Sequence, residues 1–276
     1  MKISDITIGQ YFPGNSPIHR MDPRMKLTLV AVYIVMLFVA RNLFAMAVGV
    51  LFMLLIYPLS GISLRLILKS VKPILPIIVI TAVFNMLFVG GEPIFQWWRI
   101  TVTYEGVLTA IHMCVRILCL IGGSALLTYT TSPIAITDGI ELLFAPLKKI
   151  GAPVHEIAMM MTISLRFIPT LIEETEKIMS AQKARGADFE SGNLVKRVRA
   201  MLPILIPLFV SAFRRAEDLA LAMECRCYHG GEGRTRMRIL KFSRVDAVAA
   251  AFTALCLGAT IALNVWQPAV GAAVLP

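Results

Sequence analysis

Two arginines stand at the ends of two long helical stretches, where a guanidinium can bind a carboxylate on another protein. Residues 181–186 read Ala-Gln-Lys-Ala-Arg-Gly and residues 222–227 read Ala-Met-Glu-Cys-Arg-Cys, which places Arg185 and Arg226 41 positions apart. A guanidinium binds a carboxylate through two parallel hydrogen bonds, so the contact is specific as well as attractive. The alternative is structural, because a cation complements the dipole at a helix C-terminus and a following glycine ends the helix. The repetition favours docking, and we expect the contacts with partner proteins at Ala184, Arg185, Gly186, Cys225, Arg226 and Cys227.

The helices that carry these arginines are expected over residues 153–185 and 193–226. In both stretches apolar residues recur three or four positions apart, as in a helix that buries one face. A shorter helix over 132–149 precedes them, with Ser132 as its N-cap and Gly151 after its end. Prolines inside the two long helices remove backbone donors and predict bends that serve as hinges; they are Pro169, Pro203 and Pro207.

The composition of the chain is that of a membrane protein. Of its 276 residues, 57% are hydrophobic and 16% are charged, whereas a soluble domain has about 45–50% apolar and about 25% charged residues. A membrane-spanning helix needs roughly 20 apolar residues, and five stretches approach this length: 27–40, 43–59, 71–89, 107–129 and 245–267. We therefore expect an all-α polytopic membrane protein with about five transmembrane helices and a cytoplasmic domain of three amphipathic helices.

Lysines and arginines are distributed unevenly around these spans. If the N-terminus is cytoplasmic, 24 of the 27 lie on the cytoplasmic side, two lie outside and Arg116 lies within a span. Because cytoplasmic loops of membrane proteins carry an excess of basic residues, we expect a multi-pass protein of the cytoplasmic membrane with its N-terminus inside. The same rule accounts for the net charge of +10, so no nucleic-acid partner is expected. The predicted domains are 1–129 with four spans, 130–244 in the cytoplasm, and 245–276 with the last span and a short external tail.

Arg116 is the basic residue expected inside a span, with His112 one helical turn before it. A charge at this depth is costly and usually faces protein or water. Two alternatives follow: Arg116 is paired internally or extends toward the headgroups, or it lies at a helix interface with another subunit.

The residues do not form a recognisable catalytic or metal-binding set. Cys225-x-Cys227-x-His229 lacks an evident fourth ligand for zinc, and the glycine-rich stretch 230–235 lacks the lysine of a phosphate-binding loop. We therefore expect no enzyme activity, no cofactor and no bound metal. A stand-alone secondary carrier usually has repeated halves and polar groups at the membrane midplane, and an intramembrane enzyme needs a nucleophile and a base; neither pattern is evident.

Four stretches together resemble the T component of energy-coupling factor (ECF) transporters, the EcfT family, which is related to the CbiQ family. Residues 9–24 resemble the N-terminal signature of that family, residues 164–169 with 181–186 resemble its first coupling helix, and residues 222–236 resemble its second. The resemblance covers nearly the whole chain.

The resemblance implies a coupling function and a set of partners. Two ABC ATPase subunits of the EcfA type dock on paired Ala-Arg-Gly-type motifs, and a membrane-embedded S component binds the substrate. The T component then transmits ATPase motion for the uptake of vitamins or other micronutrients. Residues 184–186 match the motif in full, whereas in the second motif only Arg226 matches, because Cys225 and Cys227 replace alanine and glycine. A T component dedicated to cobalt, nickel or biotin uptake is the alternative within the same family.

Overall fold

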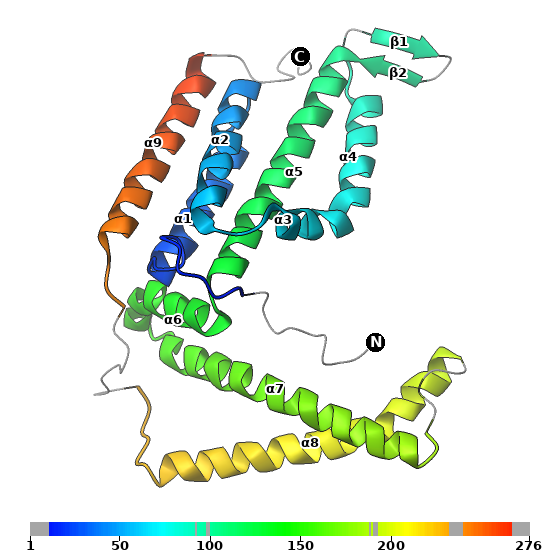
Figure 1. Ribbon diagram of the computed structural model, residues 1–276, viewed down its shortest axis with the longest axis vertical. Coiled ribbons are helices and arrows are strands. Elements are labelled where there is room, and N and C mark those ends of the chain that lie inside the picture. The colour runs from blue at the N-terminus through cyan, green and yellow to red at the C-terminus, as the bar shows by residue number, and fades with distance from the viewer. Residues whose placement is uncertain are drawn as a thin grey trace. The chain divides into compact units, whose positions relative to one another are not determined.

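The computed structural model describes residues 11–91, 93–97, 100–187, 189, 193–231 and 240–266. The chain divides into two compact units. Residues 11–139 and 240–266 form a unit of apolar helices, the apolar unit; residues 140–231 form a unit dominated by two long helices, the helix-pair unit (Figure 1).

Four helices form the body of the apolar unit. Helix α1 and helix α2 each pack against both helix α5 and helix α9, so the last described helix lies beside the first (Figure 1). Three of these helices have a side-chain cap that accepts a hydrogen bond from a backbone N–H of the first turn. The caps are Asp22 for α1, Asn42 for α2 and Thr103 for α5. The bounds are α1 Pro23–Val39, α2 Leu43–Ser60, α5 Tyr104–Thr130 and α9 Arg244–Trp266.

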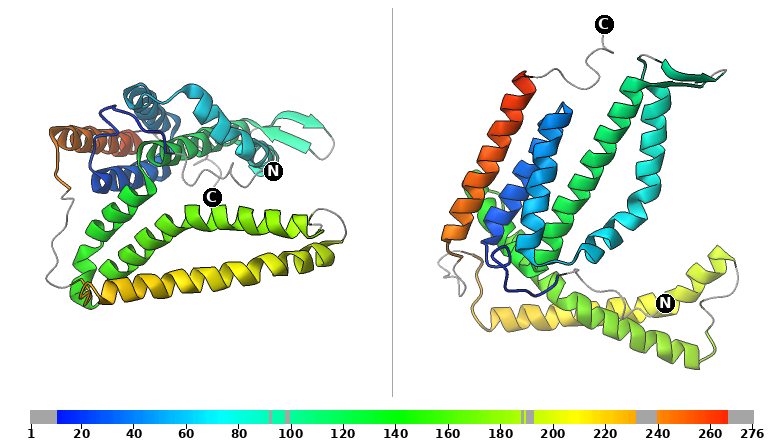
Figure 2. Two further views of the ribbon diagram at one scale, coloured as in Figure 1. Left: turned by 60° about the horizontal axis from the view of Figure 1, so that its bottom comes forward. Right: turned by 45° about the horizontal axis from the view of Figure 1, so that its top comes forward.

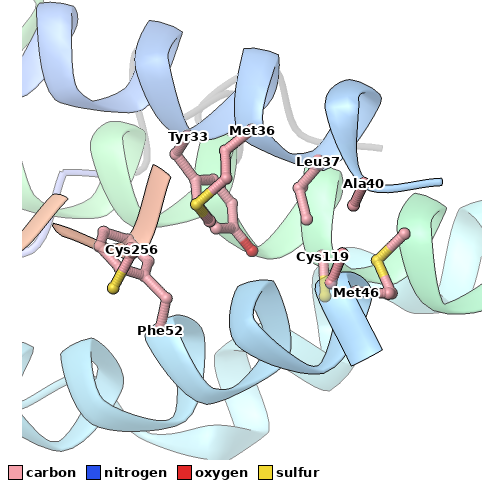
Figure 3. Close-up of a cluster of buried hydrophobic side chains, with 9 residues drawn as sticks. Tyr33, Met36, Leu37, Ala40, Met46, Phe52, Cys119 and Cys256 are labelled. Carbon is pink, nitrogen blue, oxygen red and sulfur yellow. The ribbon is translucent and has the colours of Figure 1, made fainter. Parts of the chain in front are cut away.

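A cluster of buried side chains joins these four helices (Figure 3). The ring of Tyr33 in α1 stacks on Phe52 of α2 with 5.0 Å between centroids, and Phe52 stacks on Phe252 of α9 at 5.6 Å. Gly123 of α5 lies against the Tyr33 ring, where a Cβ atom would come within 2.8 Å of a ring carbon. The close approach of α1 and α5 therefore needs glycine at this position. The other buried members are Met36, Leu37, Ala40, Ala45, Met46, Cys119 and Cys256.

Four helical segments among the described residues are long and apolar enough to cross a membrane: Leu43–Ser60, Arg65–Phe88, Tyr104–Thr130 and Arg244–Trp266. Helix α1 has 17 residues, one fewer than the shortest of these four, which has 18. The all-α polytopic fold is confirmed, and the total of five spans stays a prediction.

The segment between α2 and α5 is more divided than the single span expected over 71–89. Helix α3 (Leu64–Val71) is followed by the 3-10 helix η2 (Lys72–Ile74) and by α4 (Leu75–Phe88), and the ribbon turns sharply between α3 and α4 (Figures 1 and 2). Pro73 lies in η2 and has no N–H to continue the hydrogen-bond ladder. Two short antiparallel strands, β1 (Pro93–Trp97) and β2 (Ile100–Thr103), follow α4. The all-helical expectation does not include this hairpin.

The helix-pair unit is built on α7 (Val154–Ala184) and α8 (Leu194–Glu224), each of 31 residues. Both begin and end within two residues of the predicted bounds, and they run side by side in opposite directions (Figures 1 and 2). The single helix predicted over 132–149 is wrong in its second half. Helix α6 (Pro133–Leu143), which contains the boundary between the units, ends early, and the 3-10 helix η3 (Ala145–Ile150) follows with Pro146 in its first turn. Ser132 caps α6 by accepting from the Ala135 N–H, and Gly151 ends η3 in the left-handed conformation, both as predicted.

Candidate functional site

The first candidate site is the turn that ends α7, which we call the first tip. Arg185 occupies the C-cap position, and its side chain is exposed. Gly186 follows in the left-handed conformation with φ of +86°, and its N–H donates to the Lys183 carbonyl at 3.0 Å. The N–H of Ala187 donates to the Gln182 carbonyl, also at 3.0 Å. These two bonds define a Schellman motif, which closes the helix and leaves the arginine at its end.

The second tip, at the end of α8, has the same turn without a glycine. Cys227 has φ of +54° and is the described non-glycine residue with positive φ. Its N–H donates to the Glu224 carbonyl at 2.8 Å, and the Tyr228 N–H donates to the Met223 carbonyl at 3.0 Å. Arg226 therefore takes the position that Arg185 takes in the first tip, and its side chain is also exposed.

The two tips correspond bond for bond at a sequence separation of 41 residues. Every donor and acceptor of the first Schellman motif has its counterpart 41 positions later in the second. A left-handed conformation is strained by roughly 1–2 kcal/mol for a residue that carries a Cβ atom, so Cys227 keeps the shape of the turn at a cost that Gly186 avoids. The departure of residues 225–227 from the Ala-Arg-Gly pattern consequently leaves the backbone turn unchanged, with the arginine at the same position of it.

The helix pair holds the two tips at its opposite ends, because α7 and α8 are antiparallel (Figures 1 and 2). Glu174 of α7 accepts a hydrogen bond from Arg215 of α8 in an ion pair that is partly exposed. Burial between the helices is otherwise slight: Ala158 is the buried residue of α7. The pair thus presents two similar charged ends and a long, largely uncovered body.

Both helices continue through their internal prolines without a break. Pro169 lies inside α7, and Pro203 and Pro207 lie inside α8. The hinge role of these three residues stays a prediction.

The segment after the second tip folds back onto the start of α7. His155 donates from Nδ1 to the Glu141 carboxylate at 2.9 Å, and Gly231 lies so close to the imidazole that a Cβ atom would be 2.4 Å from a ring carbon. His229 donates from Nδ1 to the Cys227 carbonyl at 2.9 Å.

Within the described part of the chain, no group of three or more His, Cys, Asp or Glu side chains is arranged to hold a metal ion.

Arg116 of α5 is bonded inside the apolar unit. Its Nη2 donates to the carbonyl oxygen of Ala40, just after α1, at 2.7 Å and lies 2.9 Å from His112 Nε2. The guanidinium carbon also lies 5.8 Å from the centre of the Phe38 ring. Internal bonding, one of the two alternatives drawn from the sequence, is therefore present, and contact with another subunit stays a prediction.

Comparison with known proteins places the chain in a family. The sequence model of the CbiQ family, described as cobalt transport protein, matches residues 14–237. The energy-coupling factor transporter transmembrane protein EcfT of Thermosediminibacter oceani is 51% identical over 95% of this chain and 99% of its own length. The proteins of the same name from Acidaminococcus fermentans and Lactococcus lactis are 54% and 47% identical, each over 89% of this chain, and over 92% and 93% of their own lengths. The chain belongs to the EcfT family.

Membership in the EcfT family confirms the resemblance seen in the sequence. It makes the chain a transmembrane component of an energy-coupling factor transporter, and hence a membrane-embedded transport subunit rather than an enzyme. The stand-alone carrier and the intramembrane enzyme are set aside with it. The assignment of particular residues to contacts with other subunits stays a prediction.

Asp246 binds the N-terminal EcfT-type signature to the last helix, a structural role that was not predicted from the sequence. The buried carboxylate of Asp246, in the first turn of α9, accepts from the backbone N–H of Asp22 at 3.0 Å and from that of Ser243 at 2.7 Å. Arg24 pairs with the Asp22 carboxylate at 2.9 Å and donates to the Leu240 carbonyl at 3.2 Å. This network, the Asp246 clamp, fixes the start of α9 to the start of α1. Two features of the sequence could have suggested it: an acidic residue stands at the start of the predicted span 245–267, and the N-terminal signature carries charged residues just before the first predicted span.

Three charged groups around the clamp have shifted pKa values. Burial alone would raise the pKa of Asp22, but the hydrogen bonds and charge of Arg24 outweigh it and hold that pKa below its ordinary value. The hydrogen bond to Asp22 in turn raises the pKa of Arg24. Lys26, which precedes the predicted span 27–40, donates to the Thr130 carbonyl at 2.9 Å. Burial lowers the pKa of Lys26 to about 8.

Proposed function

We propose that this EcfT-family chain couples ATP hydrolysis by two cytoplasmic ABC ATPase subunits of the EcfA type to a membrane-embedded, substrate-binding S component. The observation that carries the proposal is the equivalence of the two tips. Arg185 and Arg226 occupy the same C-cap position of the same turn at opposite ends of one helix pair. Such a pair suits two similar ATPase subunits, each with a groove that receives one helix end and an acidic group that meets the guanidinium.

The body of the helix pair supplies the connection between the ATPases and the membrane. Helix α8 exposes a series of large apolar side chains, which suits contact with the membrane partner or with lipid; they include Val198, Met201, Leu205, Ile206, Phe209, Val210 and Phe213. In this proposal, closure of the ATPases moves the tips, and the helices bend at Pro169, Pro203 and Pro207. Replacing all three prolines with alanine should leave assembly intact and lower coupled uptake. Unchanged uptake would show that the prolines bend the helices but do not act as hinges.

The proposed orientation places residues 130–244 and the N-terminus in the cytoplasm and the C-terminus outside the cell. The uneven distribution of basic residues supports it, with 24 of 27 on the cytoplasmic side. A cysteine introduced at position 272 should react with an impermeant reagent added to intact cells, and one at position 190 should not. The reverse labelling would contradict the orientation.

The proposed substrates are vitamins or other micronutrients, bound by the S component rather than by this chain. A second candidate is a T component dedicated to cobalt, nickel or biotin. The description of the matching family model as cobalt transport protein favours the cobalt case. Uptake of labelled cobalt and of labelled vitamins, measured in cells that carry or lack this chain, distinguishes the two.

The decisive test of the proposal is ATPase pull-down by tip variants. Arg185→Glu and Arg226→Glu should each weaken one attachment, because losing one member of a buried charge pair costs roughly 2–5 kcal/mol. Two linked contacts bind with avidity, so the double variant should lose both ATPases far beyond either single variant. Lys177→Glu, an equal charge reversal at an exposed position within α7, is the matched control and should retain them.

The structural alternative makes a different prediction for the same variants. If the arginines only complement the helix dipole, each change should cost about 0.3–1 kcal/mol of helix stability and leave assembly intact. Recovery of both ATPases with the double variant at wild-type levels would overturn the docking role.

A further inference from the structure

Three side chains of α5 carry polar atoms that are buried and have no hydrogen-bond partner among the described residues. They are the hydroxyl of Thr109, Nδ1 of His112 and Nε of Arg116. The spacing of three and then four residues places them on one face of the helix. Most threonines within the helices here donate to the carbonyl four residues earlier, as Thr81 and Thr128 do, so Thr109 is unusual in leaving its hydroxyl unused. Unpartnered groups at such a density call for a ligand or a partner.

The unused atoms of Arg116 and Thr109 show what kind of group is missing. A guanidinium has donors and no acceptor, so Nε–H of Arg116, which is buried without a partner, needs an acceptor. The Thr109 hydroxyl can donate to the same group. His112 Nε2 lies 3.2 Å from the carbonyl oxygen of Ala40, an acceptor, and 2.9 Å from Arg116 Nη2, a donor, so these contacts do not assign the imidazole proton to one nitrogen. The cluster therefore presents one N–H donor and one hydroxyl that need acceptor oxygens.

The charge of Arg116 also has no counter-ion within the described part of the chain. No ion pair is formed by Arg116 with any described carboxylate. Asp22 and Asp246 bond at the start of α1, whereas Arg116 bonds to Ala40 after its end; these positions are about 26 Å apart for 17 helical residues. A cation inside a membrane segment is usually paired. A negatively charged group with two acceptor oxygens meets both requirements, and a carboxylate is such a group.

The surroundings of Arg116 favour a protein partner over a phospholipid. The unpartnered atoms have almost no exposed area, so a partner group must displace neighbouring side chains to reach them. A slender carboxylate side chain needs less displacement than a bulky phosphodiester. Phe38, whose ring lies beside the guanidinium, is 61% exposed and is available to pack against another helix. Nη1 of Arg116 has only the weak acceptor Sδ of Met113, at 3.8 Å, and a flexible methionine can move aside.

We infer that Thr109, His112 and Arg116 form a socket for a carboxylate side chain carried by a transmembrane helix of the partner membrane subunit. The inference rests on the proposed function, which supplies that subunit in the form of the S component. It assigns the apolar unit its own attachment to the S component, separate from the ATPase attachment at the two tips. Arg116 supplies the charge and an N–H donor, the Thr109 hydroxyl orients the carboxylate, and His112 lies against the guanidinium at 2.9 Å.

The test uses the whole complex, co-expressed and purified through a tag on an ATPase subunit. Arg116→Gln should lower the amount of retained S component at least about tenfold and leave the ATPases at wild-type levels. Arg41→Gln removes a nearby exposed cation whose backbone alone is bonded, and as the matched control it should retain both. His112→Phe keeps an aromatic ring and removes both imidazole nitrogens, including Nε2 beside Arg116, so a smaller loss of S component is expected.

A crosslinking experiment identifies the partner group. A photoreactive phenylalanine analogue at Phe38 should capture an S-component helix that contains Asp or Glu. Reversing that residue to Arg together with Arg116→Asp should restore the S component that each single reversal loses. If Arg116→Gln proves unstable, the same pair of reversals and Arg116→Lys, which keeps the charge and loses the planar fork, decide the question.

Three outcomes would overturn the inference. They are full retention of the S component by Arg116→Gln, capture of phospholipid alone at position 38, and a failure of every paired charge reversal to restore assembly. These outcomes are distinct from failure of the proposed function, in which the unmodified chain itself would bring down neither the ATPases nor the S component.

Discussion

Helix α5 of the apolar unit and helices α7 and α8 of the helix-pair unit bury their surfaces to different extents. Nine of the 27 residues of α5 are buried. In contrast, α7 buries only Ala158, and Ile204 is the one buried side chain among those described in α8. The apolar unit therefore has a core of its own. The helix pair exposes an apolar stripe that an ordinary soluble unit would cover, which is what is expected of an element whose contacts lie on other molecules.

The polar contacts of the apolar unit are also more buried than those of the helix pair. The Asp246 clamp is buried, and both of its carboxylates are at most 5% exposed as whole residues. The Glu174–Arg215 pair has side chains that are 22% and 39% exposed. Removing one partner of a buried polar link leaves unsatisfied groups, whereas an exposed ion pair contributes little. Mutations of similar chemistry should consequently have unequal effects in the two regions.

The largest effect is expected for Asp246→Ala. This change leaves the buried N–H of Asp22 and the part-buried N–H of Ser243 without acceptors. The buried group alone costs about 1–3 kcal/mol and the other adds less, so we expect a loss of about 2–4 kcal/mol in the free energy of unfolding. Thermal unfolding of the chain in detergent measures it. Asp218→Ala at an exposed position of α8 should change stability by less than about 0.5 kcal/mol. Equal losses for the two variants would contradict the contrast between the regions.

A pH-dependent stability is expected from Lys26. Burial lowers its pKa from 10.5 to about 8, so between these two values the unfolded chain binds more protons than the folded one. Stability should therefore rise with pH through that interval, by about 2 kcal/mol between about pH 7.5 and 9.5. Lys26→Met has no titrating group and should show a flatter profile in the same thermal measurement. A stability that falls over this range in the wild type and not in the variant would contradict the assignment.

The two tips should respond in opposite directions to changes at the left-handed residue. Gly186→Ala introduces a Cβ atom at φ of +86° and should destabilise the first tip by roughly 1–2 kcal/mol. Cys227→Gly removes the same strain, but glycine loses more conformational entropy when the chain folds. The net effect should therefore be a stabilisation of the second tip by roughly 0.5–1 kcal/mol. Hydrogen exchange of the amides of Ala187 and Tyr228, which close the two turns, reports each effect separately. Faster exchange at Tyr228 in the glycine variant would show that Cys227 has a stabilising contact of its own.

The smallest effect is expected for the ion pair between α7 and α8. A double-mutant cycle on Glu174→Ala and Arg215→Ala should give a coupling energy of about 0.2–1 kcal/mol that decreases with added salt. A coupling above about 2 kcal/mol would show that the pair is buried in the assembled protein.

Several elements were predictable because their signals are local. The apolar runs predicted the positions of α2, α5 and α9. The three- or four-residue spacing of apolar side chains, with a helix-ending residue after it, predicted both ends of α7 and of α8. The left-handed turn at Gly186 follows from glycine itself, whereas the same turn at Cys227 runs against residue preference. The sharp turn between α3 and α4 and the short hairpin were missed, since apolar length alone cannot distinguish a bent segment from a straight span.

The contacts that organise the apolar unit could not be predicted from local patterns. Asp246 bonds to a backbone N–H 224 positions away, and Arg116 bonds to a carbonyl 76 positions away. The sequence shows that Asp246 and Arg116 are polar residues at the start of a span or within one, but it does not show which distant backbone group each of them bonds. The candidate tips were predictable as helix ends, but their bond-for-bond correspondence required coordinates.

The Glu174–Arg215 pair lies at the same distance along the chain from each of the two tips. Arg185 follows Glu174 by eleven residues, and Arg226 follows Arg215 by eleven residues, so each helix continues for about 16 Å from the ion pair to its tip. Eleven residues are close to three whole turns, and each arginine consequently leaves its helix on nearly the same side as the paired residue before it. One residue inserted between the ion pair and one tip would turn that tip by about 100° relative to the other, whereas one insertion in each helix would keep the two tips equivalent.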